Sequence, residues 1–235
     1  MMEMLDRIGR VLRFGGDRLS APDAYALWAE CYPPRPHNAL MQIEQEVVAP
    51  TIAMIAASLR CADLHRTRRA LDLGRGTGRY LPILRPAGPR LTLGLDLSMP
   101  MLARQDNGQP RICSDACRLP FRDACFDLVC SSLMAGDVQH LGAWLAEASR
   151  VLAPGGHLVY SDFHPSWAAG RWRRTFRAVD GRLIELSYFT HTIDEHLLRP
   201  ESASLAVRTI REPRLETRQA PVVVVVHAVK ARQPC

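Results

Sequence analysis

The chain has 235 residues, of which 47% are hydrophobic and 23% are charged, and its formal net charge is +6. The length suits one α/β domain with a small appendage, and the composition is that of an ordinary globular protein. The longest purely apolar run, residues 221–226, excludes a transmembrane helix, which needs about 20 residues.

Residues 1–18 alternate apolar side chains with arginines. They contain no continuous apolar segment, so we expect no secretory signal. The chain has 7 cysteines, an odd number, without the paired spacing of a zinc site. We therefore expect no metal site, small buried thiols in the reduced state, and a cytoplasmic location.

Nearly all of the positive charge is arginine, and it is spread along the chain. This distribution favours an ordinary charged surface over a nucleic-acid interface. The densest cluster lies at Arg171, Arg173, Arg174 and Arg177, next to aromatic side chains. This cluster has two interpretations: a binding site for an anionic substrate, or the solvated face of an amphipathic helix.

The first 68 residues predict an N-terminal helical lid. A short helix is expected over residues 24–30, and the proline-rich segment 32–37 ends it. Asn38 is a good N-cap for a second helix that runs to about residue 60, because apolar side chains follow it at helical spacing.

From residue 69 onward, strand and helix signals alternate. Strands are expected over residues 69–73, 91–95, 111–113, 126–131, 157–161, 207–212 and 222–230, and a helix over residues 141–151. Such alternation is typical of a parallel, doubly wound α/β sheet. We expect a lid over residues 1–68 and a sheet domain over residues 69–235, in which the polar insertion 163–202 caps the substrate.

The first strand of the sheet ends at Asp72, and the loop Gly74-Arg75-Gly76-Thr77-Gly78 follows it. Glycine permits a tight turn and a close approach of the backbone to a ligand. A dinucleotide site would carry the spacing G-x-G-x-x-G, because a pyrophosphate must lie on a helix N-terminus. Here the spacing is G-x-G-x-G, and the Asp72 carboxylate repels a pyrophosphate but attracts an ammonium group. The loop therefore favours a ligand with a positively charged amino-acid end, and a helix is expected to begin near Arg79.

Two further aspartates follow the next strands. Asp96 ends the second strand, where a carboxylate can accept two hydrogen bonds from ribose hydroxyls. Asp115 follows the third strand and can accept a hydrogen bond from an adenine amino group. Each aspartate alone can also be a strand-end cap or a turn former. Together with the loop, the aspartates indicate an adenosine joined to a cationic amino acid.

Four segments are similar, in the same order, to the motifs of class I S-adenosylmethionine-dependent methyltransferases: Ala70–Tyr80, Gly94–Leu102, Asp115–Leu128 and Arg150–Val159. The chain most resembles the bacterial small-molecule group with the ubiquinone/menaquinone-biosynthesis and malonyl-carrier-protein methyltransferases. The resemblance covers about residues 25–230. It implies a Rossmann-like, seven-stranded, mostly parallel sheet with an antiparallel last strand. It also implies S-adenosylmethionine as cofactor and methyl transfer to a small molecule in a biosynthetic pathway.

The resemblance also implies roles for single residues. Asp72 and the loop residues Gly74, Arg75, Gly76, Thr77 and Gly78 would hold the methionine end of the cofactor. Asp96 would bind the ribose, Leu97 would pack on the adenine, and Asp115 and Ala116 would bind the adenine edge. Ser131 and Ser132 would lie beneath the sulfonium, and Tyr32 would belong to an aromatic lid with Tyr25 and Trp28.

Two positions depart from the family pattern. Relatives usually have a small residue at position 75, whereas Arg75 here either pairs with the cofactor carboxylate or turns to solvent. The segment 135–138 lacks the histidine pair that many relatives carry after the fourth strand.

Methyl transfer is an in-line displacement in which the protein supplies alignment and, in some enzymes, a base. A histidine has a suitable pKa for that base near neutral pH. The candidates are His164, which follows the fifth predicted strand, His191 in the insertion, and His37 in the lid. Each of them can equally be a surface or capping residue.

The aromatic and arginine side chains of the lid and the insertion predict an acceptor that is partly apolar and acidic. Two other functions stay open: an S-adenosylmethionine-binding scaffold or rearrangement catalyst, and a nucleic-acid methyltransferase. The latter would carry an Asn-Pro-Pro-aromatic tetrapeptide after the fourth strand, which is absent, so we expect no nucleic-acid partner. The sequence predicts neither the acceptor atom nor the oligomeric state.

Overall fold

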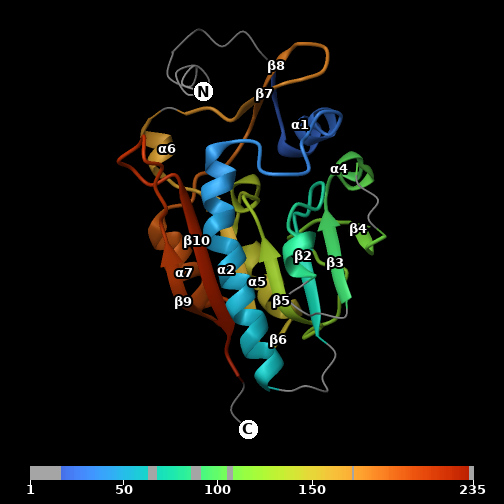
Figure 1. The fold of residues 1–235 in the computed structure, drawn as a ribbon, viewed down its shortest axis with the longest axis vertical. Coiled ribbons are helices and arrows are strands. Elements are labelled where there is room, and N and C mark those ends of the chain that lie inside the picture. The colour runs from blue at the N-terminus through green and yellow to red at the C-terminus, as the bar shows by residue number, and fades with distance from the viewer. Residues whose placement is uncertain (1–16, 63–67, 86–90, 105–107, 171, 233–235) are drawn as a thin grey trace.

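The computed structural model describes residues 17–62, 68–85, 91–104, 108–170 and 172–232. Its central sheet has the strand order β4-β3-β2-β5-β6-β10-β9 (Figure 1). The strands are β2 (Arg69–Leu73), β3 (Leu91–Asp96), β4 (Arg111–Cys113), β5 (Phe126–Ser131), β6 (Leu152–Phe163), β9 (Leu205–Arg211) and β10 (Val223–Lys230). The predicted strands are therefore confirmed, with small shifts at their ends.

Pairing in this sheet is parallel from β4 to β6, and β10 runs antiparallel to both β6 and β9. The chain thus has the Rossmann-like, mostly parallel sheet with an antiparallel last strand that the sequence predicts. One boundary is wrong: β6 begins at Leu152, five residues before the expected start at His157. The pairing of Leu152 with Phe126 continues the ladder through a register shift, so the glycine-rich segment is absorbed into the strand.

Helices cover both faces of the sheet (Figure 1). Helix α2 (Ala39–Ala62) packs on β6 and β10, and Asn38 caps it as predicted by accepting a hydrogen bond from the Met41 N–H. Helices α5 (Leu141–Val151) and α7 (Ile193–Ser202) pack on the opposite face. Each face carries its own apolar cluster, so α2 and α5 are both held by burial of side chains against the strands.

Short helices follow several strands at one end of the sheet. They are α3 (Leu81–Leu84), α4 (Met99–Ala103), the 3₁₀ helix η2 (Ala135–Asp137) and α6 (Ser166–Ala169). Helix α3 begins two residues later than the predicted start near Arg79, because Gly78 still has a left-handed φ of +87°.

A second, three-stranded sheet stands above the carboxyl ends of the central strands (Figure 1). It joins β1 (Asp17–Leu19) in parallel to β8 (Leu183–Leu186), which pairs antiparallel with β7 (Thr175–Arg177). Helix α1 (Ala21–Trp28) packs on it, and Trp28 stacks on Phe176 at 4.6 Å between ring centroids. We call α1, β1, β7 and β8 the cap.

The cap changes two expectations about the lid and the insertion. Residues 17–19 form a strand rather than part of a helix, because β8 offers them a free edge. The segment 173–177 is also extended, and its side chains alternate between exposed and buried, so the arginine cluster is not the face of a helix. The lid and the insertion therefore build one packed unit with its own apolar cluster. Residues 1–16 and 63–67 of the lid, and Arg171, lie outside the described residues.

Within the described ranges, no helix combines the length and the apolar character that crossing a membrane requires. Cys31, Cys113, Cys117, Cys125 and Cys130 carry free thiols. The expectation of buried thiols holds for Cys130 but is wrong for Cys31 and Cys113, which are exposed.

Candidate functional site

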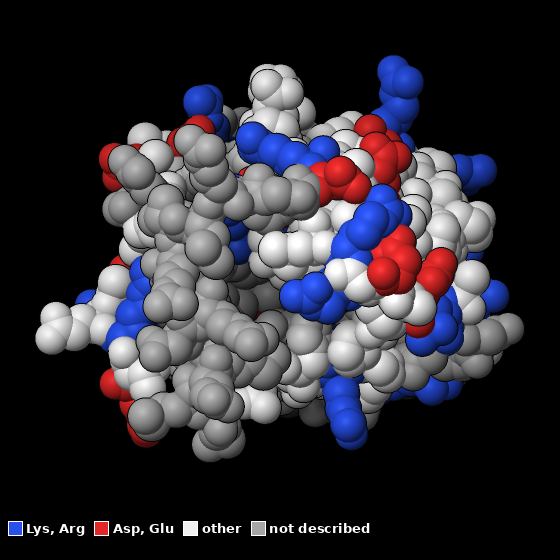
Figure 2. Space-filling view, turned by 90° about the horizontal axis from the view of Figure 1, so that it is seen from above, with Lys and Arg blue, Asp and Glu red and all other residues white. Residues whose placement is uncertain are grey.

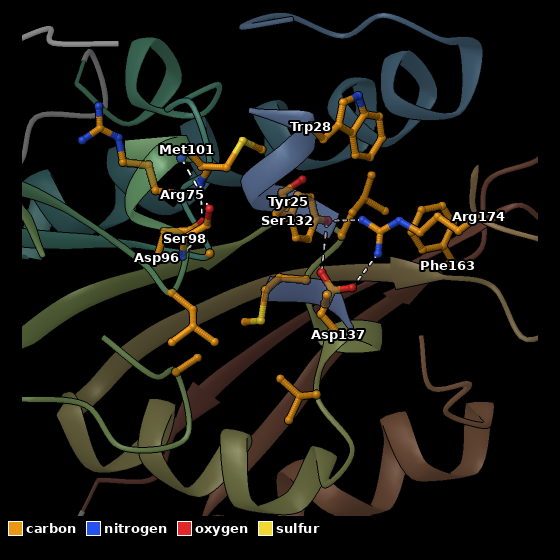
Figure 3. A pocket seen from close by; sticks show the side chains of 18 of the residues that line it. Tyr25, Trp28, Arg75, Asp96, Ser98, Met101, Ser132, Asp137, Phe163 and Arg174 are labelled. Carbon is orange, nitrogen blue, oxygen red and sulfur yellow. Dashed lines mark hydrogen bonds and ion pairs between the residues drawn. The ribbon is translucent and has the colours of Figure 1, made fainter. Parts of the chain in front are cut away.

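A cavity of about 1080 Å³ opens at the carboxyl ends of β2, β3 and β5, beneath the cap (Figure 3). Residues of the glycine loop, of the strand ends, of α1 and of the insertion line it. In open α/β sheets, ligands bind at this edge, because loops from neighbouring parallel strands converge there.

The glycine loop is tied to the end of β3. The N–H groups of Gly74 and Arg75 both donate to the Leu95 carbonyl at 2.9 Å. The glycines at 74, 76 and 78 have φ angles of +72°, +54° and +87°, which favour glycine. At Gly74 a Cβ atom would also come within 2.5 Å of the Met134 Cγ atom. The loop thus keeps its backbone at the cavity wall, where Gly74, Gly76 and Thr77 line it.

Asp72 ends its strand as a buried carboxylate in the cavity wall. Its Oδ2 atom has no hydrogen-bond partner among the described residues. Burial raises the pKa of Asp72 to about 7, although Arg75 and Arg79 oppose the shift. A buried carboxylate without a partner is costly, and a cationic donor in the cavity would relieve that cost. Asp72 is therefore suited to an ammonium group.

Asp96 lies on the same wall and holds the loop in place. Its Oδ2 atom accepts a hydrogen bond from the Gly76 N–H at 2.6 Å, and its Oδ1 atom accepts one from the Ser98 N–H at 2.8 Å. Burial raises its pKa, and these two hydrogen bonds partly offset the shift. Because each carboxylate oxygen has two lone pairs, Asp96 can accept further hydrogen bonds from hydroxyl groups.

The structure brings the third aspartate to the same cavity. Asp115 is exposed and lines the wall with Leu97 and Ala116. Its Oδ1 atom accepts a hydrogen bond from the Cys117 N–H at 2.8 Å. Leu97 is 51% exposed and offers an apolar surface between Asp96 and Asp115. The predicted set of residues at successive strand ends thus lies around one space.

Arg75 does not turn to solvent, because its side chain is buried. The guanidinium lies within 3.2 Å of the position that a Cβ atom on Gly78 would occupy, and the Arg75 Cδ atom lies 2.1 Å from the corresponding position on Gly94. Figure 3 shows the side chain extending away from Tyr25, Asp137 and Arg174. Arg75 therefore packs against the loop and β3, and it is also one of the residues that line the cavity.

The two serines after β5 differ. Ser132 lines the cavity, whereas Ser131 is buried and does not line it. Gly78 of the glycine loop does not line the cavity either. The Ser132 hydroxyl donates to the Glu44 Oε1 atom at 2.8 Å and accepts from Arg79. Ser132 is thus part of a larger polar network.

Glu44 of α2 is the centre of that network, and sequence reasoning missed it. Its side chain is fully buried. It pairs with the Arg79 Nη2 atom at 2.9 Å and accepts hydrogen bonds from the hydroxyls of Tyr80, Ser132 and Ser161 at 2.7, 2.8 and 2.6 Å. The network joins α2 to the exit of the glycine loop and to the ends of β5 and β6.

A second missed cluster joins the cap to the body. The Asp137 carboxylate of η2 pairs with the Arg174 Nη1 atom at 2.6 Å and accepts from the Tyr25 hydroxyl at 3.1 Å. Arg174 also donates to that hydroxyl. Figure 3 shows all three side chains meeting at the cavity. Because the partners lie 112 and 37 positions from Asp137 in the chain, no local pattern reveals the cluster.

The predicted aromatic lid does line the cavity. Trp28 contacts Tyr32 edge to face at 4.8 Å between ring centroids, and His37 contacts Tyr32 at 5.4 Å. Burial raises the pKa of Tyr32 and lowers that of His37. His37 is therefore a neutral imidazole near neutral pH, able to accept a proton in the cavity.

The other two candidate bases do not line the cavity. The His164 Nδ1 atom accepts from the Ser166 N–H at 3.1 Å, and its Nε2 atom lies 3.3 Å from Glu212. The His191 Nε2 atom lies 2.9 Å from the Val138 carbonyl oxygen, within the body. The expected role of His164 and His191 as bases therefore does not fit this geometry, because their ring nitrogens are engaged elsewhere.

Comparisons with known proteins agree with this geometry. Residues 71–160 match the family described as "Methyltransferase domain". The chain is 33% identical to the malonyl-[acyl-carrier protein] O-methyltransferase of Methylococcus capsulatus, over 61% of this chain and 55% of that one. It is 35% identical to the demethylmenaquinone methyltransferase of Deinococcus radiodurans, over 55% of this chain and 53% of that one. The chain spans about half the length of the curated relatives it matches.

A solved structure shares the fold. An S-adenosylmethionine-dependent methyltransferase from Mesorhizobium loti superposes with a TM-score of 0.57 at 24% identity, covering 74% of this chain and 96% of that one. Residues 71–160 are therefore similar in sequence to a methyltransferase domain, and the solved structure shares the fold of the chain.

We predict that Gly94→Ala destabilises the protein by about 1–3 kcal/mol, because the new Cβ atom overlaps Arg75. In the double variant with Arg75→Ala, the clash is gone and the combined cost is smaller than the sum of the single costs. Urea unfolding of the single and double variants measures this coupling. Gly142→Ala is the matched control, because its Cβ atom would meet only Arg199 at 3.7 Å. Additive effects of the two substitutions would contradict the packing of Arg75.

We predict that Glu44→Gln lowers the free energy of unfolding by about 3–5 kcal/mol, because it leaves the Arg79 charge buried without its partner. The exposed Glu46 on the same helix supplies the control, Glu46→Gln. Equal unfolding midpoints for the two variants would show that the network does not hold α2 to the loop.

Proposed function

We propose that this chain, whose residues 71–160 match a methyltransferase domain family, binds S-adenosylmethionine in the cavity and transfers its methyl group to a small-molecule acceptor. The observation that carries the proposal is the buried Asp72 carboxylate beside the glycine loop, whose Oδ2 atom has no hydrogen-bond partner among the described residues. Bound S-adenosylmethionine supplies an electrophilic methyl group, so the protein needs to bind, orient and exclude water.

The residues of the wall fit such a cofactor. Asp72 would accept hydrogen bonds from its ammonium group, and Asp96 would accept from the ribose hydroxyls with its remaining lone pairs. Leu97 would pack on the adenine, and Asp115 and Ala116 would bind its edge, as the resemblance implies. Gly74, Gly76 and Thr77 bring the backbone close to the methionine end.

Acceptor activation would fall to His37, the candidate base that lines the cavity. Its neutral state near physiological pH suits removal of a proton from the acceptor. Tyr32 and Trp28, which contact this ring, would shape the space around it. The aromatic lid would thus both cover the acceptor and hold the base.

A small-molecule acceptor fits the surface better than a nucleic acid. Figure 2 looks onto the cap end, where the described Arg side chains stand beside Asp and Glu side chains. The relatives named above act, by their names, on an acyl-carrier-protein conjugate and on a menaquinone precursor. For this chain we propose only the shared class of acceptor, a small molecule of a biosynthetic pathway. We also propose that the protein is cytoplasmic.

We predict that the purified protein binds S-adenosylhomocysteine in calorimetry and that Asp96→Ala weakens binding at least about tenfold, because both the ribose acceptor and the tie to Gly76 are lost. Asp180→Asn, which changes an exposed aspartate of the cap, is the control. Absence of binding by the wild type would refute the proposal. A mass-shift screen of a metabolite extract then separates methyl transfer from cofactor binding without transfer.

We predict that S-adenosylhomocysteine affinity rises with pH until Asp72 is ionised, since its pKa is about 7. Below that pKa the neutral carboxyl group attracts an ammonium group only weakly. The affinity for S-adenosylhomocysteine then falls by at most about tenfold for each pH unit. The α-amino group of the ligand belongs to a free amino acid, whose adjacent carboxylate keeps its pKa above the value of about 7.7–8.0 of a peptide N-terminus, so the group stays charged through this range. Calorimetry across the range measures the slope. Asp72→Asn should flatten it, and an unchanged slope in that variant would assign the titration to another group.

A further inference from the structure

The cavity continues past the aspartates into a compartment with aromatic walls. On one side, Trp172 packs against both Phe163 and Trp167 at 5.0 Å between ring centroids. On the other side, Trp28 and Tyr32 of the lid contact each other at 4.8 Å. All of them line the cavity. Under the proposed function this aromatic compartment holds the acceptor, because the aspartates occupy the cofactor end.

Among the described residues, the arginines that line the cavity are paired or packed against the protein. Arg79 pairs with Glu44 at 2.9 Å, and the exposed Arg173 pairs with Glu185 at 3.2 Å. Arg75 is packed against the glycine loop and Gly94. Among the described arginines that line the cavity, the one that contacts a ring of the aromatic compartment is Arg174, over Phe163.

Arg174 is buried and already neutralised. Its guanidinium pairs with Asp137 at 2.6 Å, donates to the Tyr25 hydroxyl, and lies over the rings of Tyr25 and Phe163 at 5.4 and 5.0 Å. A carboxylate ligand that reached this guanidinium would also meet the Asp137 carboxylate. Like charges in a partly buried space repel strongly, so the pair disfavours an anion that Arg174 alone would attract.

We infer that the acceptor is an uncharged molecule with a flat ring system, and that Asp137 sets this preference by neutralising Arg174. The aromatic walls supply stacking surface for the ring. The acidic acceptor expected from the arginine-rich insertion is thereby replaced by a neutral one. This inference rests on the proposed function only in assigning the compartment to the acceptor.

Two probes of nearly equal shape test the preference: 2-naphthamide, which is neutral, and 2-naphthoate, which is anionic. Calorimetry with saturating S-adenosylhomocysteine should show at least about tenfold tighter binding of 2-naphthamide to the wild type. Equal or tighter binding of 2-naphthoate would overturn the inference. Failure of both probes to bind would overturn the assignment of a ring-binding compartment.

Two substitutions that change the charge in opposite directions test whether the Asp137–Arg174 pair causes the preference. Asp137→Asn frees the Arg174 charge and should shift the preference toward 2-naphthoate by about tenfold. Arg174→Met removes the cation and leaves Asp137, so it should shift the preference further toward 2-naphthamide. Asp180→Asn removes one of the two carboxylate partners of the exposed Arg182, far from the aromatic walls, and should leave the ratio unchanged.

The ratio of the two affinities also separates this inference from loss of structure. Loosening of the cap would weaken both probes alike, so a shift of the same sign in Asp137→Asn and Arg174→Met would overturn the role of the pair. S-adenosylhomocysteine binding is measured separately for each variant. Its absence in the wild type refutes the proposed function, whereas its presence with an unshifted ratio refutes only the role of Asp137.

Discussion

Glu44 is a fully buried carboxylate that faces one cation, Arg79, and three hydroxyl groups. Burying a charge pair costs desolvation energy that only good geometry and further hydrogen bonds offset. Here the hydroxyls of Tyr80, Ser132 and Ser161 supply those hydrogen bonds. As a result, α2, the exit of the glycine loop and the ends of β5 and β6 are fixed relative to one another. This arrangement sets the shape of the cavity wall, because these elements line the cavity.

The same network leaves the Asp72 charge to be balanced elsewhere. Burial raises the pKa of Asp72 to about 7, and the nearby charges of Arg75 and Arg79 offset only part of the shift. Arg75 lowers that pKa from its place against the glycine loop and Gly94. The departure at position 75 from the family pattern thus adds a buried cation next to the glycine loop, at the wall of the cavity. A cationic ligand group would complete the balance on the open side.

The convergence of Asp72, Asp96 and Asp115 could be predicted from the sequence, because each ends a strand and parallel strands end at one edge. The role of Glu44 could not be predicted, because its partner Ser132 lies 88 positions away in the chain and no helical pattern indicates this contact. The strand-end rule also placed His164 at the cavity. It failed there because the chain turns back to β10, and the His164 N–H donates to the Val222 carbonyl.

The arginine-rich insertion shows why composition predicts charge poorly at a site. An extended segment sends alternate side chains to opposite faces, so Arg173 is exposed and Arg174 is buried although they are neighbours. A buried guanidinium must be paired, and Asp137 of η2 is the carboxylate that meets it. The extended backbone that turns Arg174 toward the cavity therefore also requires the partner that cancels its charge there. A basic residue in such a strand therefore joins the cap to the body, because its charge is matched by Asp137 at the cavity wall rather than left for an anionic ligand.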